Sequence, residues 1–424
     1  MTLNEYLSAA AARLRNGGRV YLCPASLETV LAARILKNEY GASPSGFCDN
    51  DPRKQGKHLN SLPELEILSF DQALADPAAE FLVISPFHSA DIIGNLVLER
   101  GVAPERVLNH HPVERRKTCA RFAQNWMITD SSYYCCCMAD MPTFPHDPSD
   151  PEKGVETLDR VRNGLIDGTV PLPEKCLDCF HNRESFLYTS RKLNSFNFSF
   201  VGWCNYKCEY CSANQPDRKH YNEKFYLEEY LTALERRDMV NDVFSVLFAT
   251  GEPTLNEKRL PLYRHCEEKG YFLDVFSNCS VLDRDLLGMA RRSPVIIRKS
   301  FDAGTPETYA RIKGVNRWEK MLENVRQYVQ APYLAFNPKY LFLPGVNDNE
   351  TDVENFVRLC AELKVDFVTP VFSFLDDSYE SSEQARRMFK LLVDRLAEEG
   401  IFTANVDTLY SGSYHQLYQA SFQP

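Results

Sequence analysis

The chain has 424 residues, 44% of them hydrophobic, and a formal net charge of −10. This length allows two or three domains, and the absence of a basic block argues against nucleic acid or an anionic membrane as a partner. No apolar run reaches the roughly 20 residues that cross a bilayer, and the charged N-terminus lacks the apolar core of a signal peptide. We therefore expect a soluble, cytoplasmic protein.

The first 110 residues alternate between strand and helix patterns. Residues 18–25 and 80–87 are predicted to be buried strands, whereas residues 26–40 and 89–100 have the apolar spacing of helices. Gly101 is a helix stop signal. This alternation predicts a small parallel sheet with flanking helices, that is, a doubly wound α/β domain.

This region resembles the small Rossmann-like domains attached to sugar-modifying enzymes and sugar acyltransferases. The resemblance lies in DNDPRKQG (49–56) and VLERGVAPERVL (97–108). The first turn, CPASLET (23–29), lacks the G-x-G-x-x-G glycines that cradle a pyrophosphate, although Asp49 lies about where a ribose-binding acid would lie. We therefore interpret residues 1–110 as a docking or vestigial domain rather than as a functional dinucleotide site.

The alternation stops in residues 111–191, which hold clustered cysteines, a proline-rich loop and one helical pattern at 154–168. It returns in residues 192–400 and leaves 401–424 as a weakly patterned tail. The second alternating region predicts a six-stranded parallel arrangement, either an open barrel or a doubly wound sheet. Its candidate strands are residues 196–202, 243–251, 272–278, 294–302, 335–343 and 366–374.

Three of the fourteen cysteines follow the first of these strands at C-x3-C-x2-C spacing: Cys204, Cys208 and Cys211. Three thiolates can hold three irons of a 4Fe–4S cluster and leave the fourth iron open. A structural zinc ion needs four closed ligands, and the nearest histidine is His220. The spacing therefore favours an iron–sulfur cluster over zinc.

The segment CNYKCEYC (204–211) resembles the motif C-x3-C-x-aromatic-C of the radical S-adenosylmethionine (SAM) superfamily. Later segments match in order: FATGEPTL, DVFSNCS and RKSFDAG, with Thr250 where the family has a first glycine. The resemblance covers about residues 196–374 and implies a partial (βα)6 TIM-like barrel that binds SAM on the open iron. Reductive cleavage of SAM would then give a 5′-deoxyadenosyl radical. The implied cofactor-binding residues are Tyr210, Gly251, Glu252, Pro253, Ser277, Asn278, Ser300 and Asp302.

A second cysteine set lies upstream and resembles the auxiliary-cluster modules called twitch or SPASM domains. On this resemblance the ligands of a second 4Fe–4S cluster are Cys119, Cys136, Cys176 and Cys179, with Cys135 or Cys137 as alternatives to Cys136. Asp130-Ser131 replaces the usual Asp-Gly turn. Because four thiolates also suit zinc, a structural zinc knuckle is the alternative.

Together these features predict an enzyme that abstracts hydrogen from a carbon of a small molecule, such as a sugar or a glycan-linked metabolite. We expect an external electron donor of the flavodoxin or ferredoxin type. A peptide-modifying radical SAM enzyme, a glycyl-radical activase and a non-catalytic iron–sulfur carrier are the alternatives. Cys279, at the end of the third strand, is interpreted as a small packed residue rather than as a hydrogen donor.

Overall fold

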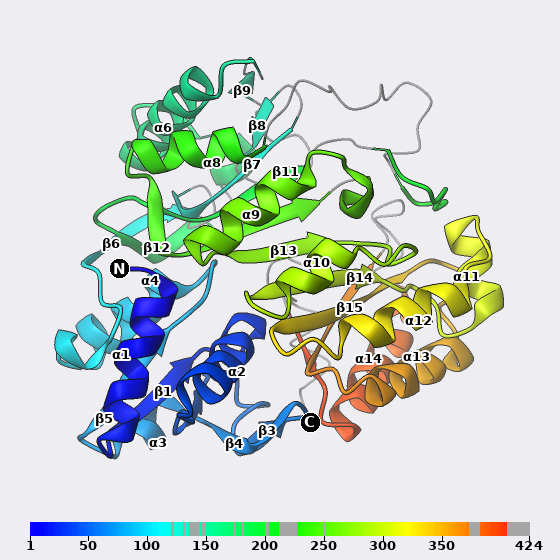
Figure 1. Ribbon diagram of the computed structural model, residues 1–424, viewed down its shortest axis with the longest axis horizontal. Coiled ribbons are helices and arrows are strands. Elements are labelled where there is room, and N and C mark those ends of the chain that lie inside the picture. The colour runs from blue at the N-terminus through cyan, green and yellow to red at the C-terminus, as the bar shows by residue number, and fades with distance from the viewer. Residues whose placement is uncertain are drawn as a thin grey trace.

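The computed structural model describes residues 1–119, 123–129, 132–134, 144–145, 147, 149–172, 174–177, 179, 182–199, 203–211, 227–249, 251–372 and 382–404. An N-terminal α/β domain lies beside a larger barrel-like sheet, and helices cover the outside of that sheet (Figure 1). Among the described residues, no helix has both the length and the apolar character that a bilayer crossing requires.

The N-terminal sheet has the strand order β3-β4-β2-β1-β5. Four of its strands are parallel, and the short β3 pairs antiparallel with β4 at one edge. The chain moves from β1 through β2 to β4 on one side and then crosses to β5 on the other side of β1. The strands are β1 (Arg19–Cys23), β2 (Gly46–Cys48), β3 (Lys57–Leu59), β4 (Leu62–Leu68) and β5 (Ala79–Val83).

Helices cover both faces of this sheet, as the sequence predicts. In β1, Val20 and Leu22 pack into one hydrophobic cluster, while Tyr21 and Cys23 pack into another. Side chains alternate across a strand, so the two clusters lie on opposite faces. The first cluster contains α1 (Leu3–Arg15) and α2 (Leu27–Tyr40), and the second contains α3 (Phe70–Leu74), α4 (Ser89–Gly94) and η1 (Asn95–Glu99).

The larger sheet contains all six predicted strands, each parallel to the next in chain order. These are β11 (Leu193–Ser199), β12 (Val240–Ala249), β13 (Phe272–Phe276), β14 (Val295–Ser300), β15 (Leu334–Phe342) and β16 (Phe367–Phe372). Their outer face packs on the core cluster that holds α8 (Leu227–Arg236), α9 (Arg259–Lys269), α10 (Arg284–Met289), α11 (Pro306–Lys313), α12 (Trp318–Tyr328), α13 (Glu350–Glu362) and α14 (Glu383–Glu398).

The sheet extends beyond the six predicted strands. Parallel to β11 runs β7 (Asn125–Ile128), followed by antiparallel β8 (Ser132–Tyr134) and β9 (Phe144–Pro145). At the other edge β17 (Phe402–Thr403) pairs parallel with β16. The prediction of six strands was therefore too low, and the predicted tail begins with a strand. Segments of two to four residues carry too little periodic pattern to be recognised.

The cysteine-rich segment packs on both neighbouring regions. Its antiparallel ribbon, β6 (Val113–Cys119) with β10 (Asn182–Tyr188), packs on α4. Gly94 permits this contact, because a Cβ there would lie 2.2 Å from the Phe186 ring. Meanwhile α6 (Pro151–Asp167) packs on α8. The segment thus bridges the N-terminal domain and the large sheet.

A buried polar layer crosses the inner face of the large sheet. Arg298 Nε donates to Asp274 at 2.8 Å, and its Nη1 donates to Asn337 Oδ1 at 3.1 Å. Thr369 Oγ1 donates to the same Asn337 oxygen at 2.9 Å. Buried charges persist only when they are paired and hydrogen-bonded, and this layer meets both conditions.

Candidate functional site

The three cysteines Cys204, Cys208 and Cys211 lie half-buried in the loop 203–211, which follows β11. Two backbone hydrogen bonds fasten this cysteine loop to the end of α11: Lys207 N donates to Lys313 O at 3.1 Å, and Glu209 N to Ile312 O at 3.0 Å. The helix ends at Gly314, which has φ +66° and where a Cβ would lie 2.9 Å from the Lys207 carbonyl oxygen. Glycine is therefore needed for both conformation and space.

A buried cluster of Tyr210, Asp302 and Lys313 supports the loop from within. The Tyr210 hydroxyl donates to Asp302 Oδ2 at 2.6 Å, and Lys313 Nζ donates to the same carboxylate oxygen and to the Tyr210 oxygen. Burial alone would raise the pKa of Asp302, but Lys313 and Tyr210 hold it below its usual value. Burial and the neighbouring Asp302 raise the pKa of Tyr210. An aromatic residue of the cysteine motif is thus tied to the end of β14.

Glu252 joins the ends of β12 and β13. Its carboxylate accepts hydrogen bonds from the Ser277 hydroxyl at 2.7 Å, the Asn278 backbone N–H at 2.6 Å and the Thr254 hydroxyl at 2.6 Å. Burial raises the pKa of this carboxyl group, while these donors oppose the shift. The preceding Gly251 has φ +65°, a conformation that glycine adopts without strain.

Asn278 connects this arrangement to the cysteine loop. Its Nδ2 lies 2.8 Å from Asn205 Oδ1 and 3.7 Å from Cys204 Sγ. Asn205 in turn donates to the Ser280 hydroxyl oxygen at 2.7 Å. The segments CNYKCEYC, GEP and SNCS, which lie far apart in sequence, therefore meet at the carboxyl ends of adjacent parallel strands, where α/β barrels place their active sites.

The structure places the other predicted cofactor-binding residues around this point. Pro253 begins the short helix η4 (Pro253–Leu255), and Ser300 is half-buried at the end of β14. Asp302 has no exposed surface. Its two carboxylate oxygens accept hydrogen bonds from Tyr210, Lys313 and the Leu341 backbone N–H. Its contact with a cofactor stays a prediction.

Sequence reasoning missed Lys313. The sequence shows a lysine at the end of a helix, which is typical of a solvent-exposed side chain facing the helix dipole. Only the tertiary structure shows that this side chain is buried against Asp302. Cys279 is also buried, and its φ of +54° makes a small residue the suitable one. This supports its interpretation as a packed residue.

The donor chemistry of the cysteine loop fits an iron–sulfur cluster better than a single metal ion. Burial raises the pKa of Cys204 to about 11. Neighbouring thiols make smaller contributions: Cys208 raises the pKa of Cys204, and Cys211 raises the pKa of Cys208. Three thiols on one short loop are the ligand type that iron–sulfur clusters use, and the loop 203–211 offers no fourth cysteine to close a zinc site.

Three members of the upstream cysteine set lie on segments near one end of the β6–β10 ribbon. Cys119 is the last residue of β6 and pairs with Asn182, the first residue of β10. Cys179 accepts a backbone hydrogen bond from Asn182 at 2.8 Å, and Cys176 lies one turn earlier in α7 (Glu174–Leu177). The fourth predicted ligand, Cys136, and its alternatives Cys135 and Cys137 lie outside the described residues.

Comparison with known families identifies the barrel. Residues 198–360 match the model of the Radical SAM superfamily, so this part of the chain is a radical SAM domain. The match includes the cysteine loop, Glu252 and Asp302. It covers neither the N-terminal α/β domain nor the upstream cysteine set.

Individual proteins are similar to parts of the chain. A GTP 3′,8-cyclase of Acaryochloris marina is 29% identical over 36% of this chain and 49% of its own length. A probable GTP 3′,8-cyclase of Thermococcus kodakarensis is 25% identical over 38% of this chain and 51% of its own. The chain thus spans about half the length of these curated relatives. SuiB of Streptococcus suis, solved with the precursor peptide SuiA, superposes with a TM-score of 0.41 at 16% identity, over 62% of this chain and 60% of that one.

Proposed function

We propose that this protein is a radical SAM enzyme that abstracts hydrogen from a carbon of a small molecule, a sugar or a glycan-linked metabolite. The observation that carries the proposal is the meeting of three strand-end segments through Glu252, Asn278 and Cys204. An electron carrier needs only cysteine ligands. It has no use for a buried carboxylate and an asparagine that order two further strand ends beside the cysteines.

The residues of the site have separable tasks. When bound, a 4Fe–4S cluster with SAM on its open iron supplies the electron that cleaves SAM and so generates the radical. Cys204, Cys208 and Cys211 would hold this cluster, and the buried Lys313 cluster fixes the loop that carries them. Gly251, Glu252 and Pro253 form the strand end that faces the methionine amine in this proposal, since carboxylate and carbonyl oxygens accept hydrogen bonds from an ammonium group.

The upstream cysteine set is proposed to hold a second, fully ligated 4Fe–4S cluster. Its proposed ligands are Cys119, Cys176 and Cys179, which lie on segments near the end of the ribbon, with Cys136 as the fourth. With no open iron, such a cluster suits electron transfer to or from the substrate. The first electron would come from an external donor of the flavodoxin or ferredoxin type.

A small-molecule substrate is favoured over a peptide by two observations. The N-terminal domain is a doubly wound α/β sheet, and the winged-helix domains that bind leader peptides are not built in this way. The curated relatives are named for a reaction of GTP, which is a small molecule. Neither observation fixes the substrate of this chain, so the substrate class belongs to the proposal.

The test is anaerobic reconstitution of the full chain with iron and sulfide, followed by addition of SAM and dithionite. We expect 5′-deoxyadenosine to form, as measured by mass spectrometry, and to fall to background in Cys208→Ala. Cys360→Ala is the matched control, because Cys360 is a buried cysteine of the α13 core. A fully iron-loaded wild-type chain that forms no 5′-deoxyadenosine would refute the enzyme and favour the electron carrier.

A further inference from the structure

A cavity of about 950 Å³ lies where the N-terminal domain meets the barrel. It is bounded by the loops that follow β1, β2 and β5, by the β10 side of the ribbon, and by Arg298 and Phe367 of the barrel. Cavities that enclose small molecules have volumes of roughly 300–1,000 Å³. Among the described residues, its lining includes none of the three loop cysteines and none of Cys119, Cys176 and Cys179.

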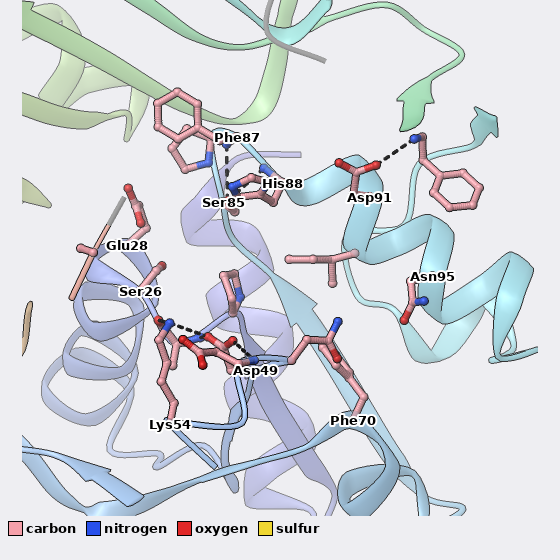
Figure 2. Close-up of a pocket in the computed structure, with 18 of the residues that line it drawn as sticks. Ser26, Glu28, Asp49, Lys54, Phe70, Ser85, Phe87, His88, Asp91 and Asn95 are labelled. Atoms are coloured by element: carbon pink, nitrogen blue, oxygen red, sulfur yellow. Dashed lines mark hydrogen bonds and ion pairs between the residues drawn. The ribbon is translucent and has the colours of Figure 1, made fainter. Parts of the chain in front are cut away.

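Its position follows from the topology of the N-terminal sheet. The strand order changes direction between β1 and β5, because β2 and β4 lie on one side of β1 and β5 lies on the other. The loops after these two strands therefore diverge, and open α/β sheets bind their ligands in the crevice left there. Both loops line the cavity, through residues 24–28 and residues 85–88 (Figure 2).

The cavity is not built for a dinucleotide. The Asp49 carboxylate, at the position of a ribose-binding acid, accepts from the Ala25 backbone N–H at 3.1 Å, the Asp51 N–H at 2.9 Å and Lys54 Nζ at 2.8 Å. The Asp49 carboxylate is thus occupied by hydrogen bonds that hold the β1–α2 loop in place, and it is not free to bind a ribose. Glu28 adds a carboxylate to the first turn of α2, where a pyrophosphate would bind, and like charges there repel.

Two carboxylates face the cavity from opposite sides, Glu28 on α2 and Asp91 on α4 (Figure 2). Glu28 is 6% exposed, and burial raises its pKa although the charge of Arg298 opposes the shift. Within the described residues Glu28 forms no ion pair, since Arg298 is itself paired with Asp274 at 2.7 Å. Asp91 Oδ1 accepts from the Phe186 backbone N–H at 2.8 Å.

The rest of the lining is close to neutral and partly aromatic. Phe70 and Phe87 are among the lining residues, and so is Ser26, whose hydroxyl group also caps α2 by accepting from Thr29 N (Figure 2). Carboxylates accept strong hydrogen bonds from hydroxyl groups, and the electron-rich face of an aromatic ring attracts the C–H face of a saturated ring. Six acidic side chains and five lysine or arginine side chains line the cavity, so strongly charged ligands gain little there: Glu28, Asp49, Asp51, Asp91, Glu99, Glu184, Arg53, Lys54, Arg115, Arg183 and Arg298.

We propose that this cavity binds an uncharged polyhydroxylated ring, such as a sugar or the ribose of a nucleoside, with Glu28 and Asp91 accepting hydrogen bonds from its hydroxyl groups. The inference does not rest on the radical chemistry, because its residues are separate from both cysteine sets. Part of the cavity lining nevertheless belongs to the barrel, namely Arg298 and Phe367. The Arg298 backbone oxygen accepts from Ser277 N at 3.0 Å, and Ser300 lies two residues further along the same strand.

The experiment measures binding of defined probes to the full-length chain by saturation-transfer NMR and calorimetry. The probes are the methyl glycosides of glucose, galactose, mannose and N-acetylglucosamine, together with adenosine, NAD and inorganic phosphate. We expect saturable binding of at least one glycoside or of adenosine, and no preference for NAD or phosphate. Binding of a methyl glycoside would identify the sugar form of the ligand, and binding of adenosine alone would identify the ribose form.

Variants decide whether the probe occupies this cavity. Glu28→Gln keeps the shape but replaces one carboxyl oxygen with an NH2 group, and it should weaken binding by about fivefold or more, since a ligand hydroxyl group loses an acceptor. Glu105→Gln, in the same domain but outside the cavity lining, should bind like wild type. If Glu28→Gln does not fold, Phe87→Ala serves as the second variant. It removes a half-buried aromatic ring from the cavity lining and should also weaken binding of the probe.

Three results would overturn the proposal. The first is that none of the glycosides binds and adenosine does not bind. The second is that NAD or phosphate binds more tightly than every uncharged probe. The third is that a glycoside or adenosine binds with equal affinity to wild type and to the folded cavity variant.

Discussion

The two cysteine sets are supported in different ways. The cysteine loop is fastened to α11 by two backbone hydrogen bonds and to the end of β14 by the buried Lys313 cluster. The segments that carry the upstream cysteine set lie at one end of a two-stranded ribbon. Asp167 forms surface ion pairs with Arg116 of this ribbon and with Arg191, which follows its other end. Buried charge pairs are costly to break, whereas exposed pairs contribute little. The first site is therefore held in place by the fold, and we propose that the second depends more on the cluster it would bind.

The largest expected effect separates the two sites by their iron content. In the triple variant Cys204→Ala, Cys208→Ala, Cys211→Ala we expect about four irons per chain to remain, because one 4Fe–4S cluster would be lost and the other kept. Cys176→Ala with Cys179→Ala should lose the other four. Iron and sulfide analysis of anaerobically reconstituted protein measures both. A folded triple variant with almost no iron would remove the second cluster from the proposal.

The next effect tests the buried support of the cysteine loop. Lys313→Met leaves the Asp302 carboxylate buried without its cation, and removing one partner of a buried pair costs about 3–5 kcal/mol. Denaturant unfolding of the iron-free chain measures this loss. Lys320→Met is the control, because its pair with Glu323 is exposed and is worth at most about 1 kcal/mol. Equal losses in the two variants would contradict the distinction between buried and exposed support.

A smaller effect separates the ring of Tyr210 from its hydroxyl group. Tyr210→Phe keeps the ring beside Leu341 and Leu343 and removes the hydrogen bond to Asp302. Because Lys313 still pairs with that carboxylate, the expected loss is about 1 kcal/mol. Formation of 5′-deoxyadenosine should continue in this variant. A loss as large as that of Lys313→Met would show that the hydroxyl group, and not the lysine, carries the support.

Much of the barrel could be predicted because its signals are local. Each of the six predicted strands is a segment of seven to nine residues with several apolar side chains, and the cysteine spacing stands in one short segment. Strand ends in a parallel sheet meet at one edge, so the meeting of GEP and SNCS beside Cys204 also follows from the sequence. The hydrogen bond from Asn278 to Glu252 specifies how they meet, and only the fold shows it.

The missed features depend on contacts between distant segments. The short strand β7 forms only because β11 offers a free edge, and its four residues carry no pattern of their own. Lys313 is buried because Asp302 follows a neighbouring strand. The cavity at Glu28 exists because two domains pack together. In each case tertiary context overrides a local preference for loop or surface.

The smallest expected effect concerns the ion pairs of the ribbon that carries the upstream cysteine set. Hydrogen bonding to Arg191, with Arg116 nearby, holds the pKa of Asp167 below its ordinary value of 3.8. A carboxyl group whose pKa is lowered by folding stabilises the folded chain above its unfolded pKa, and this contribution is lost as the pH falls through the folded value. Asp167→Asn should therefore lower the urea midpoint slightly at pH 7, and the difference from wild type should shrink below about pH 4.

Salt provides the matched control for this prediction. Asp167 is open to solvent, so 1 M sodium chloride, with a Debye length of about 3 Å, should screen its attraction to the two arginines and reduce the difference at pH 7. The same salt should leave the loss in Lys313→Met almost unchanged, because that pair is buried. A difference for Asp167→Asn that does not shrink at all as the pH falls below 3.8, nor in high salt, would mean that this carboxylate supports the ribbon by packing or by neutral hydrogen bonds. The two cysteine sets would then differ less in their support than the structure indicates.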